Sequence, residues 1–271
     1  MSENEQERLE QAQKSKRNFL AIGARNLLAI GAIAASAAVA RSTRVLADND
    51  CDSPGDGGCC FLRGTKIQTV PGERNVEDLA IGDLLPTVFG GVRPIQWIGR
   101  YRYNKSNPSK PWAKYARPVQ ISSSALAPNV PHTDLYVTPG HALFIDGVLV
   151  PVGRLINGTT IALYGAVEYD ELEYFHIKLE THDVIHAEGA WCETLLSVDE
   201  TASNFADYLR KYGTPETEEL PCAPVLYHGA RSEIKARLRS VMSPGPQKLD
   251  IIRERLAARA IALRSRMEAT S

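Results

Sequence analysis

Hydrophobic and polar positions divide this chain into three parts that differ in periodicity. An apolar run made mainly of Ala, Gly, Leu, Ile and Val covers residues 19–40, short strand-like stretches fill residues 60–199, and helical spacing begins after residue 200. Because side chains repeat every two residues in strands and every 3.6 in helices, the middle part predicts an all-β domain and residues 200–271 a helical tail. Helices are expected over residues 203–212, 233–242 and 249–267.

The middle part carries the turn residues that a β domain needs. Strands are predicted over residues 66–70, 142–145, 148–150, 174–179 and 184–187. Pro71-Gly72 ends the first strand, and Asp146-Gly147 separates the second from the third. Asp-Gly between two apolar runs is a strong signal for a two-residue hairpin, because both turn residues must adopt positive φ. Weak helical periodicity between the runs favours an all-β fold over an α/β fold.

A seven-residue pattern, V-x-x-L-x-x-G, occurs twice in this domain. It covers Val76–Gly82 and Val152–Gly158, and both copies follow a predicted strand–turn–strand and precede another β stretch. The pattern indicates two similar supersecondary units, each too small to bury its own apolar face, that pack together.

Residues 1–47 have the composition of an export signal. Lys16 and Arg17 precede the apolar run, and small residues offer cleavage sites after Ala40 or Ala47. The segment S-K-R-N-F-L resembles the twin-arginine export pattern, with lysine in place of the first arginine. The sequence therefore predicts an exported protein, either periplasmic or secreted.

An uncleaved inner-membrane anchor over residues 19–40 is the alternative to a cleaved signal. The apolar run approaches the length of a bilayer span, but its small residues and Arg25 make a poor permanent span. Residues 48–59 that follow are acidic and rich in Gly and Asp, which predicts a flexible linker. Any membrane contact is expected only through the signal segment.

Charge and cysteine content narrow the possible partners. Thirty-one basic and 32 acidic residues give a net charge of -1, which argues against a nucleic-acid-binding protein. The chain has five cysteines, Cys51, Cys59, Cys60, Cys192 and Cys222, and three of them fall within ten residues. An odd and small number of cysteines does not indicate a disulfide framework, so at least one thiol is expected to be unpaired or reactive.

Cys60 and His141 form a candidate nucleophile and base. Cys60 directly precedes the first predicted strand, and His141 ends the turn segment T-P-G-H, which begins at Thr138. A cysteine and a sequence-distant histidine can meet in the folded chain and act together, although the same residues also fit a buried cysteine and a turn histidine. An ordinary cysteine hydrolase is another interpretation, but no Asn or Asp is recognisable that would orient His141.

Several motifs around these residues resemble those of Hint (hedgehog/intein) domains. They are C-F-L-R-G-T-K-I from Cys60, V-E-D-L-A-I-G-D over residues 76–83, T-P-G-H over residues 138–141, and the segment 175–189. In order and spacing they are most similar to the bacterial hedgehog/intein-like group, over residues 60–199. The resemblance implies an all-β horseshoe of two pseudo-symmetric β units, which agrees with the internal repeat.

The resemblance also implies a self-processing reaction. Cys60 Sγ would attack the carbonyl carbon of Cys59 and convert the peptide bond between them into a thioester. His141 would protonate the departing amide nitrogen, and Thr138 would hold that peptide or the tetrahedral oxyanion. His182 matches a histidine in a late intein strand, with Asp183 as the equivalent if the alignment slips by one residue. The expected catalytic residues are therefore Cys60, Thr138, His141 and His182.

Four positions depart from the family pattern. Glu193 and Thr194 stand where inteins place a penultimate His and a terminal Asn, so full splicing is not expected. Gly99 falls approximately where hedgehog proteins use an aspartate to activate cholesterol, so sterol transfer loses its main support. Cys59, directly before the nucleophile, would add a vicinal or competing thiol.

No cofactor or metal is expected. His182 and His186 with Cys59 or Cys192 offer a possible zinc set, but the spacing lacks C-x-x-C or a second pair. The expected substrate is the chain's own N-terminal segment, with water or a small thiol as the final nucleophile. A Hint-fold module that has lost the reaction and serves in binding is the alternative function.

Overall fold

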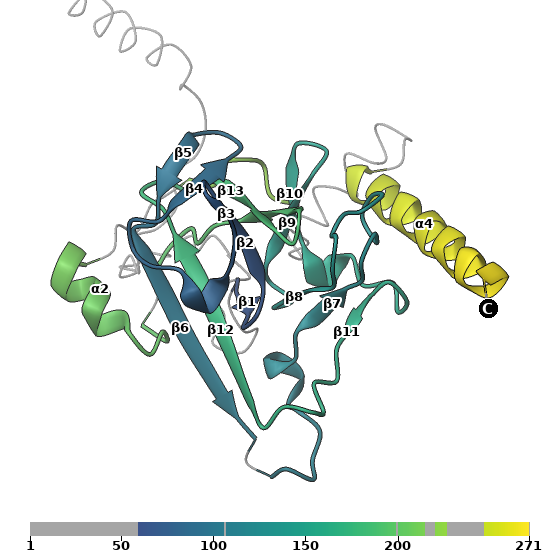
Figure 1. Cartoon of the computed structure of the whole chain (residues 1–271), viewed down its shortest axis with the longest axis horizontal. Coiled ribbons are helices and arrows are strands. Elements are labelled where there is room, and N and C mark those ends of the chain that lie inside the picture. Colours follow the sequence, from purple (N-terminus) through teal and green to yellow (C-terminus); the bar gives the residue numbers. More distant parts are fainter. Residues whose placement is uncertain (1–58, 106, 199, 215–219, 227–246, 271) are drawn as a thin grey trace, which may run out of the picture. The chain divides into compact units, whose positions relative to one another are not determined.

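The computed structural model describes residues 59–105, 107–198, 200–214, 220–226 and 247–270 (Figure 1). The expected export signal, the linker up to residue 58 and the expected helix over residues 233–242 lie outside the described residues. No helix within the described part is long and apolar enough to cross a membrane.

The described strands form two antiparallel sheets. The first has six strands in the order β11-β7-β8-β1-β12-β6. Their bounds are β1 (Phe61–Leu62), β6 (Trp97–Asn104), β7 (Val119–Ile121), β8 (Leu135–Val137), β11 (Ile161–Leu163) and β12 (Glu171–Lys178). The short β1 pairs on both sides, because Phe61 lies opposite Val137 of β8 and Phe175 of β12. The residue before β1 is therefore held at the interior of this sheet.

The second sheet has eight described strands and contains the predicted hairpin. Its main path is β10-β9-β14-β13-β2-β3, and β4 pairs with both β13 and β5. Their bounds are β2 (Lys66–Thr69), β3 (Gly72–Asn75), β4 (Leu84–Thr87), β5 (Gly91–Pro94), β9 (Ala142–Ile145), β10 (Val148–Pro151), β13 (Val184–Ala187) and β14 (Ala190–Glu193). Asp146 and Gly147 turn β9 into β10 with φ of 51° and 81°, as a two-residue hairpin requires. Glu188 and Gly189 join β13 to β14 in the same way, with φ of 49° and 79°.

The internal repeat corresponds to a repeated structure. The first three residues of each copy form a one-turn 3-10 helix. These helices are η1 (Val76–Asp78), which follows the β2–β3 hairpin, and η3 (Val152–Arg154), which follows the β9–β10 hairpin. In both copies the leucine N–H donates to the carbonyl of the valine three residues earlier, and both side chains are buried. This confirms the two similar β units predicted from the sequence. A third such turn, η2 (Lys114–Ala116), precedes β7.

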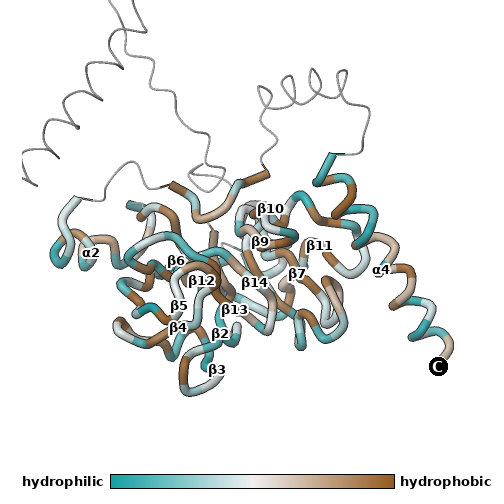
Figure 2. The backbone as a smooth tube through the Cα atoms, turned by 90° about the horizontal axis from the view of Figure 1, so that it is seen from above, coloured by the Kyte–Doolittle hydropathy of each residue, from teal (hydrophilic) through white to brown (hydrophobic). Residues whose placement is uncertain are grey.

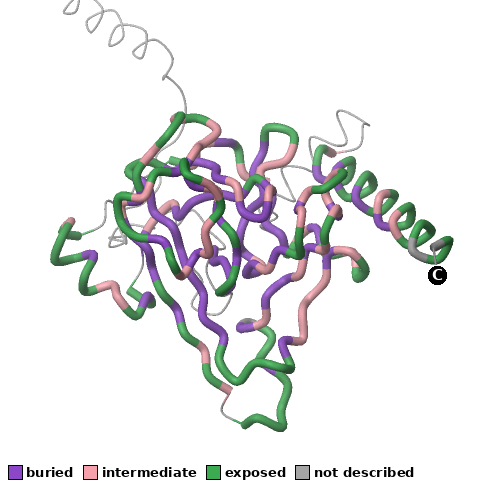
Figure 3. The backbone as a smooth tube through the Cα atoms, viewed as in Figure 1, coloured by how far each residue is buried: buried purple, intermediate pink, exposed green. Residues whose placement is uncertain are grey.

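The main apolar core is formed by buried side chains from both sheets. Phe61, Phe175 and Ile177 of the first sheet and Ile67 and Leu143 of the second belong to one buried cluster. Buried positions follow the strands in Figure 3, while the turns at their ends are exposed. Fully burying a side chain of this size contributes about 1.5–3 kcal/mol, so this cluster is the principal source of stability.

Two helices follow the β domain at positions that the helical spacing predicts. They are α2 (Phe205–Tyr212) and α4 (Lys248–Thr270). Tyr208 of α2 packs edge-on against Trp97 of β6, with ring centroids 5.4 Å apart. Leu249, Ile252 and Leu256 of α4 are buried in the main core cluster, and hydrophobic and hydrophilic positions alternate along this helix (Figure 2). The tail therefore shares the core of the β domain.

Residues 220–226 return to the second sheet between these helices. The Leu149 N–H donates to the Pro224 carbonyl, and the Leu226 N–H donates to the Leu149 carbonyl, both at 2.9 Å. Val225 thus lies beside Leu149 in a parallel bridge along β10. This segment brings Cys222 close to the residues described below.

Candidate active site

The peptide bond between Cys59 and Cys60 is buried at the start of the first sheet. Cys59 is 5% exposed and Cys60 2% exposed. Because β1 is short and pairs with β8 and β12, the backbone of Cys60 reaches the end of β8, where Thr138 follows Val137. The topology therefore brings together two residues that are 78 positions apart in the sequence.

Thr138 binds the backbone of Cys60 through both its side-chain hydroxyl and its own backbone N–H. The Cys60 N–H donates to Thr138 Oγ1 at 2.8 Å, and the Thr138 N–H donates to the Cys60 carbonyl at 3.0 Å. The first contact fixes the amide nitrogen of the Cys59–Cys60 peptide. Of the two roles expected for Thr138, the geometry corresponds to holding the peptide.

His141 lies beside the same peptide. A turn positions it, since the His141 N–H donates to the Thr138 carbonyl at 3.1 Å, and its ring packs against Phe61 with centroids 4.4 Å apart. Both ring nitrogens are buried and make no hydrogen bond of ordinary geometry within the described part. The Cys59 carbonyl nevertheless acts on the ring and favours its protonated form. The imidazole therefore stands next to the carbonyl that a nucleophile at Cys60 would attack.

Burial dominates the electrostatics of His141. It lowers the pKa of His141 to about 4, whereas the Glu193 carboxylate and the Cys59 carbonyl act in the opposite direction. His176 and His182 lie near enough to lower this pKa further. Burial also lowers the pKa of His176 to about 3. At neutral pH both imidazoles are uncharged, so His141 can accept a proton before it donates one.

His182 lies next to Glu193 at the end of the second sheet. Its Nδ1 accepts a hydrogen bond from the Cys222 N–H at 3.0 Å, and its Nε2 is 3.5 Å from Glu193 Oε2. An imidazole nitrogen that accepts cannot carry the proton in the neutral ring, so the proton of neutral His182 is on Nε2 and faces Glu193. Glu193 therefore links the two histidines, since it lies next to His182 and binds the residue that follows His141.

Asp183, the alternative equivalent of His182, has structural partners instead. Its Oδ1 accepts the N–H groups of Phe89 and Val184 at 3.0 and 2.8 Å, and its Oδ2 is 3.2 Å from Arg93 Nε. These contacts tie the β4–β5 hairpin to β13. Asp183 is not among the groups that act on His141.

Glu193 is the site residue that sequence reasoning missed. It was expected only to fill an intein position whose chemistry it cannot perform, but its side chain is buried and its Oε1 accepts the Ala142 N–H at 2.7 Å. Ala142 directly follows His141. The sequence carries a signal only for its burial, because Glu193 ends a short strand whose other residues are Ala, Trp and Cys.

Cys59 corrects one expectation about the thiols. It is disulfide-bonded, whereas Cys60, Cys192 and Cys222 are thiols, so Cys59 does not compete with Cys60 as a nucleophile. Burial raises the pKa of Cys222 to about 12, with added contributions from the charges of Asp183 and Glu193. Burial also raises the pKa of the Cys192 thiol.

Gly99 lies on β6 opposite His176. A Cβ at this position would be 2.6 Å from ring carbons of Trp97, so a longer side chain would displace that ring. The packing therefore favours glycine where a hedgehog-like acid was considered. Within the described part, no group of three or more His, Cys, Asp or Glu side chains is arranged to hold a metal ion.

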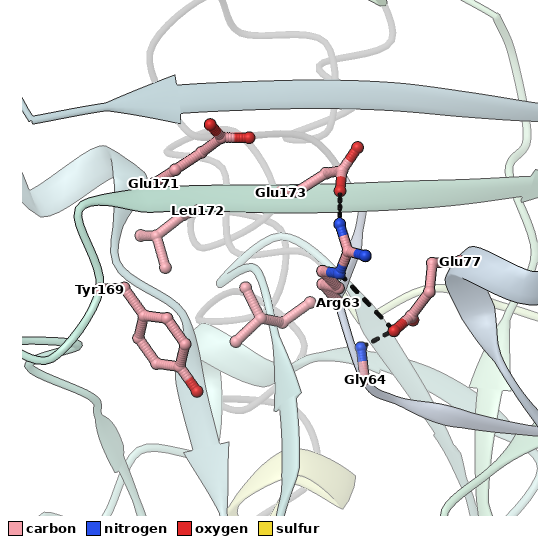
Figure 4. A pocket seen from close by; sticks show the side chains of 8 residues that line it. Arg63, Gly64, Glu77, Tyr169, Glu171, Leu172 and Glu173 are labelled. Carbon is pink, nitrogen blue, oxygen red and sulfur yellow. Dashed lines mark hydrogen bonds and ion pairs between the residues drawn. The ribbon is translucent and has the colours of Figure 1, made fainter.

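A pocket of about 280 Å³ opens beside β1 (Figure 4). Its lining includes Leu62, the second residue of β1, and the two residues that follow it. Its polar wall is an ion-paired group, in which Arg63 reaches Glu173 at 2.7 Å and Glu77 at 3.7 Å. The other lining residues are Leu62, Gly64, Tyr169, Glu171 and Leu172. Cys60, Thr138 and His141 do not line this pocket, so it is separate from the buried peptide.

The family model described as the Hint domain matches residues 59–199. Similar solved structures include the gp41-1 intein, 12% identical, covering 49% of this chain and 97% of that one with a TM-score of 0.35. Another is the bacterial intein-like domain from Clostridium thermocellum, 13% identical, covering 50% and 98% with a TM-score of 0.35. No curated protein matches the chain.

Proposed function

The chain belongs to the Hint domain family, whose fold is that of self-processing domains, and from this premise we propose that it cleaves its own backbone at Cys59–Cys60. One observation carries the proposal. The nitrogen of that peptide donates to Thr138 Oγ1 at 2.8 Å, while His141 acts on its carbonyl. Thr138 thus holds the nitrogen of this amide, and His141, the last residue of the T-x-x-H motif, lies beside its carbonyl.

The proposed reaction begins with an N–S acyl shift. Cys60 Sγ adds to the Cys59 carbonyl carbon and forms a C–S bond, and the carbonyl π electrons move to oxygen beside His141. The proton of the thiol passes to the neutral His141 imidazole. When the oxyanion collapses, the C–N bond breaks and His141 returns the proton to the nitrogen, which becomes the amine of Cys60. The proton count is conserved, and Thr138 keeps the departing nitrogen in place.

The thioester then passes to an external nucleophile. Water or a small thiol attacks the Cys59 carbonyl, releases Cys60 Sγ and leaves a fragment that begins at Cys60. Ligation is not proposed, because Thr194 Oγ1 accepts the Asp183 N–H at 2.9 Å and Glu193 binds the Ala142 N–H at 2.7 Å. Neither side chain has the amide that an asparagine uses to cyclise.

Export remains a proposal that accompanies this function. The basic residues, the apolar run and the small-residue cleavage sites of residues 1–47 support removal of that segment during passage across the inner membrane. N-terminal sequencing of the protein from separated cell fractions tests this. Protein that stays in the cytoplasm and retains Met1 contradicts it.

A Hint-fold binding module without activity is the second candidate. The burial of the peptide at Cys59 and Cys60 favours it, since an external nucleophile must reach a carbonyl that solvent barely touches. Incubating the purified full-length protein with dithiothreitol decides between the two. A new amino terminus at Cys60, with the mass of the cleaved fragment, supports cleavage. A chain that stays uncut, and whose mass changes only by reduction of the Cys59 disulfide, supports the binding module.

A further inference from the structure

Glu193 is a buried carboxylate placed between two histidines. It is 7% exposed and ends β14, which pairs with β13 on one side and β9 on the other. Its Oε1 accepts the Ala142 N–H at 2.7 Å, directly after His141 in the chain. A buried carboxylate is costly unless it is hydrogen-bonded, so this contact ties Glu193 to the turn that carries His141.

The second oxygen of Glu193 meets His182. The distance from Glu193 Oε2 to His182 Nε2 is 3.5 Å, and the Cys222 N–H on Nδ1 places the ring proton on the nitrogen that faces the carboxylate. Both neighbours therefore present N–H groups, as a carboxylate that only accepts hydrogen bonds requires. The hydrogen bond from Ala142 thus orients Glu193, and His182 Nε2 lies at ion-pair distance from its other oxygen.

We propose that Glu193 is a positioning residue for the cleavage at Cys60, which holds the His141 turn and stabilises His141 while it carries the proton. This inference rests on the proposed function. In the acyl shift the proton moves from Cys60 Sγ to His141 and then to the amide nitrogen, so His141 is briefly an imidazolium in a buried site. Burial opposes that charge, and the carboxylate of Glu193 offsets part of the cost.

The charged and titratable groups around His141 define what the carboxylate must balance. Glu193 favours the imidazolium, whereas His176 on β12 and His182 before β13 disfavour it. Cys192 and Cys222 lie close enough to Glu193 for its charge to raise their pKa values. Glu193 is thus the acidic side chain that opposes burial at His141.

The test compares three changes at this residue with a matched control. Glu193→Gln keeps an oxygen for the Ala142 N–H and removes the charge, Glu193→Asp keeps the charge, and Glu193→Ala removes both. Glu188→Gln makes the same neutralisation at a buried carboxylate that binds the Lys66 N–H at 2.6 Å. Thiol-induced cleavage is followed from pH 3 to 9 in the full chain, a range that includes the value of about 4 to which burial lowers the pKa of His141. Circular dichroism confirms that each variant is folded.

We expect Glu193→Gln to cleave on the order of tenfold more slowly, because the variant keeps the hydrogen bond to Ala142 but no longer offsets the charge that His141 carries. The acid side of its pH profile moves to lower pH, Glu193→Asp recovers most of the rate, and Glu188→Gln behaves as wild type. A structural role alone would lower the rate without moving the profile. Equal profiles in Glu193→Gln and wild type overturn the proposal.

A second measurement separates this inference from the proposed function. In Cys60→Ala, which cannot cleave, the imidazole resonances of His141 are titrated by NMR with and without Glu193→Gln. We expect the midpoint of His141 to fall in the double variant. A fall without any cleavage in the wild type means that the proposed function fails while Glu193 still tunes His141. No change in the midpoint overturns the inference, whatever the wild type does.

Discussion

The two ends of the Hint domain differ in what their hydrogen bonds hold. At the amino-terminal end, the nitrogen of Cys60 is held at 2.8 Å by Thr138, and His141 stands beside the preceding carbonyl. At the carboxyl-terminal end, the side chains of Glu193 and Thr194 bind backbone N–H groups of neighbouring segments. The first end presents a peptide bond to reactive groups, whereas the second supports them. This difference is what the proposed cleavage without ligation requires.

The largest effect is expected from removing the nucleophile. Cys60→Ala abolishes cleavage, because the proposed reaction begins with attack by the Cys60 thiol. Cys192→Ala is the matched control, since Cys192 is equally buried and its loss leaves cleavage nearly intact. Intact mass after incubation with thiol measures both. Cleavage that persists in Cys60→Ala would show that the amino-terminal end is not the reactive one.

His141→Ala is expected to have the next largest effect. Loss of a positioned proton carrier slows the reaction by about 10²–10⁴-fold. His186→Ala serves as the control, because His186 lies on β13 and packs edge-on against Trp191, with ring centroids 3.4 Å apart. Rates are taken from the fragment beginning at Cys60. Equal rates in the two variants would remove His141 from the mechanism.

Thr138→Val is expected to have a smaller effect of about tenfold. It leaves the buried Cys60 N–H without its acceptor, and an unsatisfied group of this kind costs about 1–3 kcal/mol. Thr138→Ser retains the hydroxyl and should cleave at nearly the wild-type rate. The same fragment assay measures both. A Val variant as fast as the Ser variant would mean that the hydroxyl does not position the peptide.

Acidification should change stability before it changes cleavage. The pKa of His141 is about 4 and that of His176 about 3 in the folded chain, below the ordinary value of about 6.5. The unfolded state therefore binds protons first, and stability falls as the pH drops from 6.5 toward 3, by about 3–5 kcal/mol for each histidine. Urea unfolding of Cys60→Ala at several pH values measures this. His176→Leu should flatten the slope, and an unchanged slope would contradict the assignment.

Much of the fold and part of the site could be predicted from the sequence. Asp146-Gly147 fixes a hairpin through local chemistry, and the V-x-x-L-x-x-G repeat marks two equivalent units. Cys60, Thr138 and His141 were identified as a group because their motifs resemble those of Hint domains. Local sequence patterns were therefore sufficient to predict features that depend on neighbouring residues, such as turns and short motifs.

The role of Glu193 could not be predicted in this way. Its contact with Ala142 depends on how β14 pairs with β9, and its contact with His182 depends on a segment near Cys222 that returns to the sheet. Both are set by tertiary register, which no local periodicity encodes. The packing of α4 on the core was missed for the same reason, because helical spacing predicts a helix and not its neighbour.

Trapping the acyl intermediate tests the central claim most directly. The purified full-length protein is treated with hydroxylamine at neutral pH, and the short fragment is analysed by mass spectrometry. Thioester formation predicts an amino-terminal fragment that ends in a hydroxamate on Cys59, together with a partner that begins at Cys60, and neither product in Cys60→Ala. A wild-type protein that stays intact, or a cut at any other bond, would contradict the account.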